Sequence, residues 1–66
     1  MTRERLANII ALTRGPRGIE TITGIPRRML QRWAKGERDI PDNHAATLEQ
    51  ARRSILMARL NRQVRA

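Results

Sequence analysis

Apolar residues recur along this chain at the spacing of amphipathic helices, and the interruptions between the runs predict where each helix begins and ends. Thr2 is placed to cap a first helix, because its hydroxyl can accept a bond from a free backbone N–H group. The buried stripe of this helix is expected to consist of Leu6, Ile9, Ile10 and Thr13. Gly15 is expected to supply the left-handed cap, and Pro16 cannot continue the hydrogen-bond ladder, so the helix should end there.

A second, shorter helix is predicted over residues 17–23, with Ile19 and Ile22 facing inward. Its intrinsic helix propensity is poor, because it contains glycine and threonine. The weak helix formers are Gly18, Thr21 and Thr23. This helix therefore needs tertiary packing to hold it. Gly24, which lies between Ile22 and Ile25, is suited to a turn with positive φ.

The segment from residue 25 to residue 36, IPRRMLQRWAKG, has two chemically different faces when it is wound onto a helix. At about 100° per residue, its polar side chains occupy one arc of about 140°. These side chains are Arg27, Arg28, Gln31, Arg32 and Lys35. The opposite arc is apolar and contains Pro26, Met29, Leu30, Trp33 and Ala34. Pro26 is expected in the first turn and Gly36 just beyond the end, which completes a helix-turn-helix pattern.

The remainder of the chain is predicted to be a polar turn followed by a long helix. Within GERDIPD, Asp39 or Asp42 can cap that helix. No glycine or proline interrupts residues 43–64, and the stripe suited to closing the core over the first three helices comprises Ala45, Leu48, Ala51 and Ile55. Further on, the stripe moves round the helix to Leu56, Met57, Leu60 and Val64. We therefore expect an all-α fold, a compact four-helix helix-turn-helix domain over residues 1–66 with a long C-terminal helix, or five helices if the last segment is divided.

The chain is short, and its composition limits how it can be stabilised. At 66 residues it is expected to form one domain, which at this size buries roughly 60% of its unfolded surface. It contains no cysteine and a single histidine, His44, so neither a disulfide nor a structural metal site is expected. We interpret His44 as a surface or helix-cap residue, and Trp33, the one aromatic side chain, as part of the core and not a base-stacking platform. Oligomerisation is the remaining means of support.

The charge of the chain predicts a polyanionic partner. There are 14 Lys plus Arg against 6 Asp plus Glu, a formal net charge of +8, and every cation except Lys35 is an arginine. The planar fork of arginine binds phosphate or guanine through two parallel hydrogen bonds, which favours nucleic acid over a merely basic surface. We expect no cofactor, no small-molecule ligand, no membrane segment and no enzymatic activity, because the chain shows no catalytic constellation, no apolar run of ~18 residues and no signal peptide.

Residues 19–36, IETITGIPRRMLQRWAKG, resemble the helix-turn-helix of phage and bacterial repressors of the Cro and cI type, and the following GERDIP is typical of small members. The resemblance extends from Arg5 to Leu56. It implies that Gly24 is the turn glycine and that four buried side chains lock the two helices together. These are Ile19, Ile25, Leu30 and Trp33. The positions that read bases in the family correspond to Pro26, Arg27, Arg28, Gln31 and Arg32, and Lys35 corresponds to a phosphate contact.

One position departs from the pattern of that family. The family usually has a small residue four positions before the turn glycine, and this chain has Glu20 there. Two outcomes are open at this stage. Either Glu20 tilts outward from a loosened second helix, or its carboxylate pairs with a neighbouring arginine.

The basic face of the third helix has the chemistry to read base edges. Arg27 and Arg28, at its N-terminal end, carry the fork that donates to guanine O6 and N7, and Gln31 has the donor and acceptor that match adenine. Each arginine has the alternative of a phosphate contact, which carries no sequence information. Arg17 and Arg38, on either side of the reading helix, complete the residues that we expect to contact DNA.

The apolar stripe at the end of the chain predicts a second surface, since so small a domain has little left to bury it against. We interpret it as a two-fold dimer contact, with a helix end packed on its own domain as the alternative. The contact would consist of Leu56, Met57, Leu60 and Val64, within an extension of residues 56–66 that frays at its end. A dimer would place two recognition helices about 34 Å apart on one face of DNA. The tail arginines either contact the DNA backbone or only solvate the helix; they are Arg52, Arg53, Arg59, Arg62 and Arg65.

These patterns together predict a sequence-specific regulator that binds double-stranded DNA through its major groove and phosphate backbone. The resemblance implies a repressor that acts as a homodimer on a palindromic operator, in the cytoplasm of a bacterium or of a phage-infected cell. The alternative is a nucleic-acid-binding accessory or adaptor protein, such as a recombination accessory factor or an RNA binder. RNA is disfavoured, because its deep and narrow major groove excludes such a helix.

Overall fold

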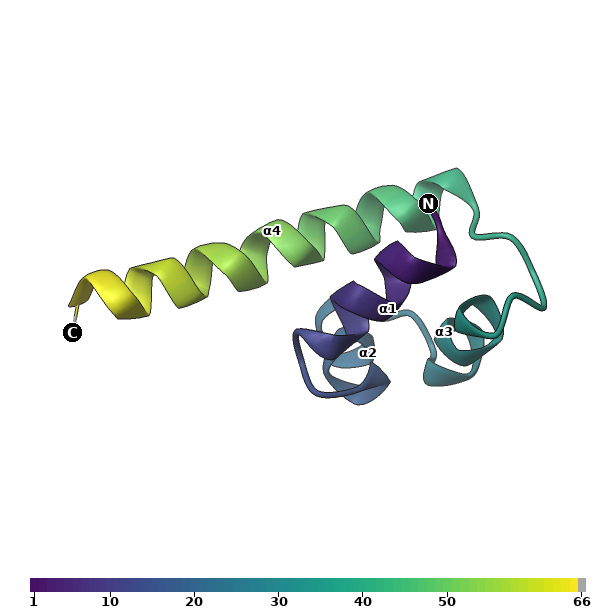
Figure 1. Ribbon diagram of the computed structural model, residues 1–66, viewed down its shortest axis with the longest axis horizontal. Helices are drawn as coiled ribbons and strands as arrows, with labels where there is room; N and C mark the ends of the chain where they lie inside the picture. The colour runs from purple at the N-terminus through teal and green to yellow at the C-terminus, as the bar shows by residue number, and fades with distance from the viewer. Residues whose placement is uncertain (66) are drawn as a thin grey trace.

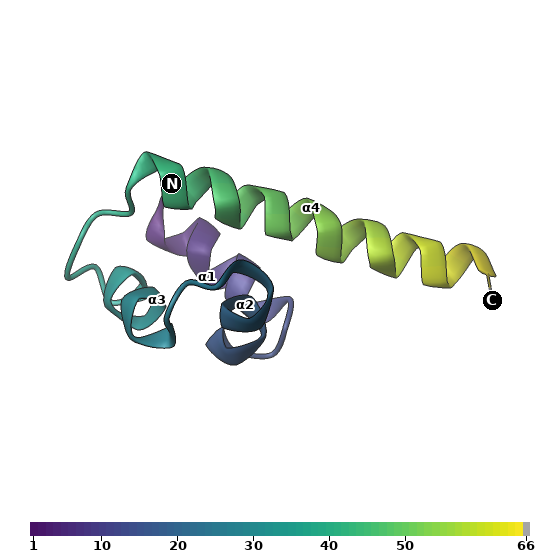
Figure 2. The ribbon, with the colours of Figure 1, turned by 180° about the vertical axis from the view of Figure 1, so that it is seen from behind.

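The computed structural model describes residues 1–65 and places the side chains of residues 1–62. These residues form no strand and four helices, which are α1 (Arg3–Ala11), α2 (Pro16–Thr23), α3 (Arg27–Ala34) and α4 (Asp42–Arg65). The predicted all-α class is confirmed, and the last segment is one helix, not two. Helices α1, α2 and α3 gather along the N-terminal part of α4, whereas its C-terminal part projects beyond them (Figure 1; Figure 2). This long helix sets the shape of the molecule, which extends 42 Å along its longest axis and 20 and 19 Å across.

One apolar core joins the four helices. Its side chains, each no more than 5% exposed, are Leu6, Ile9, Ile19, Ile25, Leu30, Trp33, Leu48 and Ala51. Partly buried side chains surround them, namely Ile10, Met29, Ala34, Ile40 and Ile55. The burial of Trp33 confirms its interpretation as a core residue. Because full burial of one large apolar side chain stabilises a fold by about 1.5–3 kcal/mol, this small set is the main source of stability.

Helix α1 begins as predicted but ends earlier. The hydroxyl Oγ1 of Thr2 accepts a hydrogen bond from the backbone N–H of Arg5 at 3.1 Å. The helix ends at Ala11, and the residue in the left-handed conformation is Arg14, with φ of 64°, so the prediction that Gly15 supplies this cap is wrong. Gly15 instead adopts φ 143° and ψ 174°, a region that is open essentially to glycine alone. The glycine is therefore required for the more extreme conformation, and the left-handed position falls on the arginine before it.

Helix α2 buries only one of the two isoleucines that were expected inside. Ile19 is fully buried, but Ile22 is 51% exposed, so its predicted inward orientation is wrong. A Cβ atom added to Gly18 would lie 2.5 Å from Cβ of Thr13, which shows how closely the chain before α2 packs on the start of this helix. Ile22 lies one turn further along the same side. Thr13 packs on the turn that contains Gly18 and not on the next turn, so the side chain of Ile22 stays largely in solvent.

The turn between α2 and α3 has the predicted geometry. Gly24 has φ of 76°, and its N–H donates to the carbonyl of Glu20 at 2.8 Å. The hydroxyl of Thr23 donates to the carbonyl of Ile19 at 2.7 Å and accepts from the N–H of Ile25 at 3.2 Å. Pro26 occupies the N-cap position, one residue earlier than predicted, so α3 starts at Arg27. These bonds set the direction in which α3 leaves α2.

At the other end, α3 closes on the predicted glycine. Gly36 has φ of 79°, and its N–H donates to the carbonyl of Trp33 at 3.0 Å. The N–H of Glu37 donates to the carbonyl of Arg32, also at 3.0 Å. This pair of bonds is the usual closure of a helix by a left-handed residue. Both ends of α3 are thus defined by backbone geometry.

The N-terminal part of α4 packs on the other helices. Leu48 and Ala51 enter the core, and the ring of His44 lies 5.2 Å from that of Trp33, centroid to centroid. His44, in the first turn of α4, is partly exposed, and its ring also covers the tryptophan, a packing role that its interpretation as a surface or cap residue did not include. Along the backbone, α4 lies close to α1 and α2, and the ring of His44 adds a contact with Trp33 of α3. Within residues 1–65, no helix combines the length and the apolar character needed to cross a membrane.

An ion pair ties α1 to α4. Nε of Arg5 donates to Oε1 of Glu49 at 2.8 Å, and Nη2 donates to Oε2 at 3.2 Å. The hydrogen bonds from Arg5 hold the pKa of the Glu49 carboxyl below its ordinary value, and the charges of Arg52 and Arg53 act in the same direction. The same bond and the carboxylate charge raise the pKa of Arg5. Such paired geometry orients α4 on α1 more than it stabilises the fold, because both side chains remain partly in solvent.

Candidate nucleic-acid interface

Helix α3 separates its side chains as the sequence predicted. The whole polar arc is exposed; it comprises Arg27, Arg28, Gln31, Arg32 and Lys35. On the opposite side, Leu30 is fully buried and Trp33 is 3% exposed. The orientation of this helix is therefore fixed by the core, and its polar arc faces solvent. Pro26, also predicted to contact DNA, is exposed in front of the first turn.

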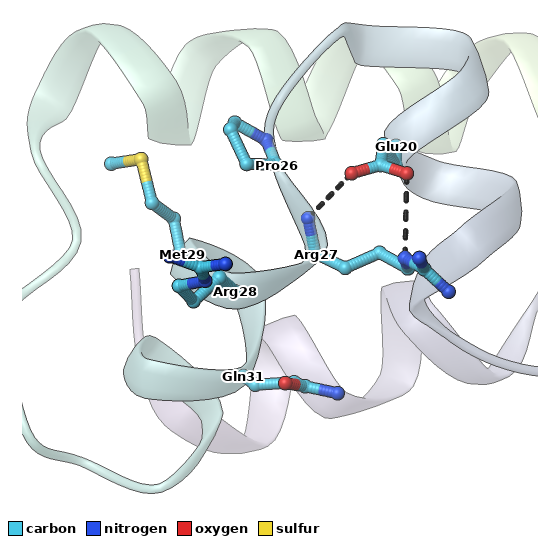
Figure 3. A pocket seen from close by; sticks show the side chains of 6 residues that line it. All are labelled: Glu20, Pro26, Arg27, Arg28, Met29 and Gln31. Atoms are coloured by element: carbon cyan, nitrogen blue, oxygen red, sulfur yellow. Dashed lines mark hydrogen bonds and ion pairs between the residues drawn. The ribbon is translucent and has the colours of Figure 1, made fainter.

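Four of the predicted contact residues line one open hollow at the N-terminal end of α3 (Figure 3). They are Pro26, Arg27, Arg28 and Gln31, and the lining is completed by Met29 and Glu20. Within the described part of the chain, Arg28 and Gln31 have no side-chain hydrogen bond to protein. Their donors and acceptors are free for a ligand. The hollow is open and lined by both polar and apolar groups, which suits a macromolecular surface better than an enclosed small molecule.

Glu20 closes the side of this hollow and pairs with Arg27 (Figure 3). Its Oε2 accepts a hydrogen bond from the backbone N–H of Arg27 at 2.8 Å, and its Oε1 lies 3.4 Å from Nε of the same residue. Of the two outcomes left open by the sequence, pairing with a neighbouring arginine is confirmed. Pro26, at the N-cap, provides no side-chain acceptor, so the carboxylate from α2 caps α3 in its place. A negative charge at this position also complements the helix dipole.

The C-terminal end of α3 carries a second basic group. Nη1 of Arg3 donates to the carbonyl of Lys35 at 3.5 Å, and Arg3 and Arg38 both line another open hollow. A Cβ atom on Gly36 would lie 2.7 Å from Nη1 of Arg3, which shows how close the arginine lies to the end of α3. Sequence reasoning did not find Arg3, because nothing in local spacing connects residue 3 with residue 35. Lys35 and Arg38 are exposed as predicted.

Arg17 is not brought into either hollow. It is exposed in the first turn of α2, a helix whose N-cap residue, Gly15, makes no side-chain capping bond. The first N–H groups of α2 therefore have no side-chain partner at the cap. The positive N-terminal end of α2 and the side chain of Arg17 therefore belong to the same turn, which is separate in sequence from the contact residues of α3.

The predicted dimer surface is exposed on the projecting part of α4. Leu56, Met57 and Leu60 are 36%, 56% and 51% exposed. Val64, the fourth residue of the predicted contact, and Arg65 have side chains that lie outside the described residues. Arg59 is not simply solvated, because its Nη2 donates to the carbonyl of Leu12 at 2.6 Å and so holds α4 to the end of α1. Arg53 and Arg62 are exposed and Arg52 is partly buried.

The candidate interface presents hydrogen-bond donors and positive charge along α3, a helix whose opposite side is held in the core. In residues 1–65, no group of three or more His, Asp or Glu side chains is placed to hold a metal ion. No protein family, curated protein or solved structure matches this chain. A functional assignment therefore depends on the geometry and chemistry of the chain itself.

Proposed function

We propose that this protein is a sequence-specific regulator that binds double-stranded DNA with α3 in the major groove. One observation carries the proposal, namely that the polar arc of α3 is exposed while Leu30 and Trp33 fix the opposite side in the core. A helix held in this way presents hydrogen-bond donors at defined positions, which is what readout of base edges requires.

The size and chemistry of α3 suit the groove. Its eight residues span about 12 Å, and the major groove of B-DNA is about 12 Å wide. Arg28 has the fork that matches guanine, and Gln31, one turn later, has the amide that matches adenine. The resemblance of residues 19–36 to the reading motif of Cro and cI repressors supports the same use of this helix.

The remaining basic residues are assigned to phosphates. Arg32 and Lys35 continue the exposed arc of α3, and Arg38 lies beyond its end. Arg17, in the first turn of α2, lies at a helix start without a side-chain cap, and such an end favours an anion. The net charge of +8 supplies the general attraction to the DNA backbone.

We further propose that the protein acts as a repressor, binding as a homodimer to a palindromic operator in the cytoplasm. A single eight-residue helix contacts too few base pairs to select one site in a genome. Two copies joined through the exposed side chains of α4 would read two half-sites. The residues proposed for this contact are Leu56, Met57, Leu60 and Val64, of which the first three are exposed apolar side chains.

Selection of bound duplexes from a random pool, followed by a salt titration, tests the DNA-binding proposal. We expect a two-fold-symmetric site that is bound about 10³-fold or more tightly than scrambled DNA. Affinity for both should fall steeply with salt, because phosphate contacts release counterions. Enrichment of no sequence contradicts the proposal. A salt dependence without a symmetric site indicates the accessory or adaptor function, and tighter binding to duplex RNA indicates an RNA binder.

The role of Gln31 as a reader is tested by the substitution Gln31→Ala. We expect the preference at one base pair to be lost, at a cost of about 1–3 kcal/mol for that contact, while preferences elsewhere are kept. Uniform weakening on every sequence would assign Gln31 to the backbone instead.

The dimer is tested by Leu60→Glu, with Ala58→Glu as the control. Both residues are exposed on α4, but at about 100° per residue Ala58 points at least about 100° away from every residue of the apolar stripe. We expect Leu60→Glu to shift the sedimentation of the protein from dimer to monomer and to weaken binding to the palindrome, and Ala58→Glu to do neither. Unchanged sedimentation and DNA binding for Leu60→Glu would exclude this contact.

A further inference from the structure

The pair formed by Glu20 and Arg27 stands at the edge of the hollow and remains accessible. The side chains are 38% and 49% exposed, respectively, so neither is buried by the contact that joins them. The carboxylate holds Arg27 at two points, the backbone N–H at 2.8 Å and Nε at 3.4 Å. The first contact fixes the start of α3, and the second fixes the direction of the arginine side chain relative to that helix.

The contact leaves the reading end of the arginine free. Within the described part of the chain, the terminal nitrogens Nη1 and Nη2 of Arg27 have no protein partner. These two nitrogens form the outer edge of the guanidinium, which can donate in parallel to O6 and N7 of guanine. An arginine held by Nε loses less side-chain freedom on binding than one that is free in solvent.

The carboxylate also changes which part of DNA this arginine favours. A free arginine beside a duplex makes phosphate contacts in most cases, since these have no directional requirement that depends on sequence. Glu20 largely offsets the charge of Arg27 and repels a phosphate that approaches the same edge of the hollow. A guanine edge carries only partial negative charges, on O6 and N7, and is therefore repelled much less than a phosphate.

We propose that Glu20 is a positioning residue that directs Arg27 to a guanine base and away from the phosphate backbone. The inference rests on the proposed DNA-binding function and adds to it one specific base contact, at the G·C pair that faces the N-terminal end of α3. Arg28 and Gln31, which have no such carboxylate, read or contact DNA independently of Glu20.

The test compares Glu20→Gln with Glu37→Gln, which removes the same charge from an exposed position just beyond α3. Binding is measured on the duplex selected by the wild-type protein and on duplexes in which each base pair is changed in turn. We expect Arg27→Ala to abolish the preference for one G·C pair. Glu20→Gln should reduce the preference at that same pair about tenfold, while binding to scrambled DNA becomes tighter and its salt slope steepens by about 0.9, as for one added phosphate contact. Glu37→Gln should leave the base preference unchanged.

A double-substitution cycle separates positioning from mere helix capping. If Glu20 acts through Arg27, the variant with both Glu20→Gln and Arg27→Ala should discriminate no less than Arg27→Ala alone. Combined with Arg28→Ala, the effect of Glu20→Gln should instead be additive. Additive effects with Arg27→Ala, or effects at different base pairs, would overturn the inference and leave Glu20 as a cap.

A replacement variant and the selection experiment itself cover the cases in which Glu20→Gln gives no usable result. If Glu20→Gln lowers the thermal stability of the protein enough to prevent binding, Arg27→Lys replaces it, because lysine keeps the charge but lacks the fork. That variant should lose the G·C preference with its salt slope unchanged, and a retained preference would overturn the inference. Failure of the wild-type protein to select any sequence would refute the DNA-reading function itself. A selected site with no base pair that depends on Arg27 would refute only the role given to Glu20.

Discussion

The inner half of α4, residues 42–55, and its outer half, residues 56–65, continue one helix with very different surroundings. The inner half buries Leu48 completely and is joined to α1 by the Arg5–Glu49 pair. The outer half projects past the other helices (Figure 1), and Leu60 is 51% exposed. Both halves are nevertheless helical.

The difference shows that α4 can continue as a helix where no other helix buries it. The outer half is rich in leucine, methionine, alanine and arginine, which are good helix formers, and it extends a helix that the packed inner half has already nucleated. The side chains of Leu56, Met57 and Leu60 add nothing to the core of one chain. They are available for contacts with something else, and substitutions should separate the two halves clearly.

The largest expected effect is that of Leu48→Ala in the inner half. Removal of this buried side chain should lower the free energy of unfolding by about 3 kcal/mol, since both the transfer energy and a cavity count against the variant. Leu60→Ala in the outer half is the matched control and should change it by less than about 0.5 kcal/mol at a concentration where the chain is monomeric. Denaturant unfolding measures both. Similar losses for the two variants would show that the outer half is packed on the same chain.

The second effect is expected for Gly18→Ala, which tests how tightly the packed part is assembled. The added methyl group would lie 2.5 Å from Cβ of Thr13, so the start of α2 must move. We expect a loss of about 2 kcal/mol, although alanine is the better helix former. Thr21→Ala, an exposed substitution in the same helix, should be nearly neutral. A gain in melting temperature for Gly18→Ala would mean that the two segments are further apart than described.

A smaller effect is expected at Arg59, which belongs to the outer half but touches α1. Its bond to the carbonyl of Leu12 is 2.6 Å long and places a cation at the C-terminal end of that helix. Arg59→Ala should therefore lower the free energy of unfolding by about 1 kcal/mol. Arg62→Ala, one turn further on at an exposed position, should change it by less than about 0.5 kcal/mol. Equal effects would indicate that the packed region ends before Arg59.

The smallest effect is the acid dependence of the Arg5–Glu49 pair. Because the pKa of Glu49 is lower in the folded chain than its ordinary value, the pair stabilises the fold above the unfolded pKa, at about pH 4 to 5. This stabilisation is lost as the pH falls through the folded pKa. Thermal unfolding from pH 7 to pH 2 should show it as a small drop that Glu49→Gln and Arg5→Gln both remove. If the two variants keep the wild-type profile, another carboxylate causes the drop.

The fold was largely predictable from local patterns. Periodicity located all four helices, and it assigned Leu30 and Trp33 to the core and Leu60 to the outside. These successes depend on spacing within one helix, which the sequence displays directly. Ile22 was misplaced because its burial depends on a neighbouring segment and not on spacing within its own helix. Periodicity gives the side of a helix, but whether that side is covered depends on where a neighbouring segment ends.

The candidate interface was predictable only in its outward-facing residues. The exposed arc of α3 follows from periodicity, but the interactions that fix its ends involve side chains from other helices. Glu20 was noticed as a departure from a family pattern, with two outcomes left open, and Arg3 was missed altogether. Contacts such as that of Arg59 with Leu12, 47 positions apart, leave no mark in local spacing. The left-handed Arg14 was missed because the neighbouring glycine was the expected choice.

Because side chains from α2 and from α1 hold the two ends of α3, this helix stays folded only while those helices stay folded. Glu20 holds its start, and the guanidinium of Arg3 lies against its last turn. At eight residues, α3 is also shorter than the ~12–15 residues that an isolated helix needs in water. A peptide of this sequence should therefore be unstructured, and the amides of α3 should exchange with solvent together with those of α1 and α2. The surface that α3 presents then exists for as long as the domain stays folded, and proteolysis of any one of these helices would remove it at once.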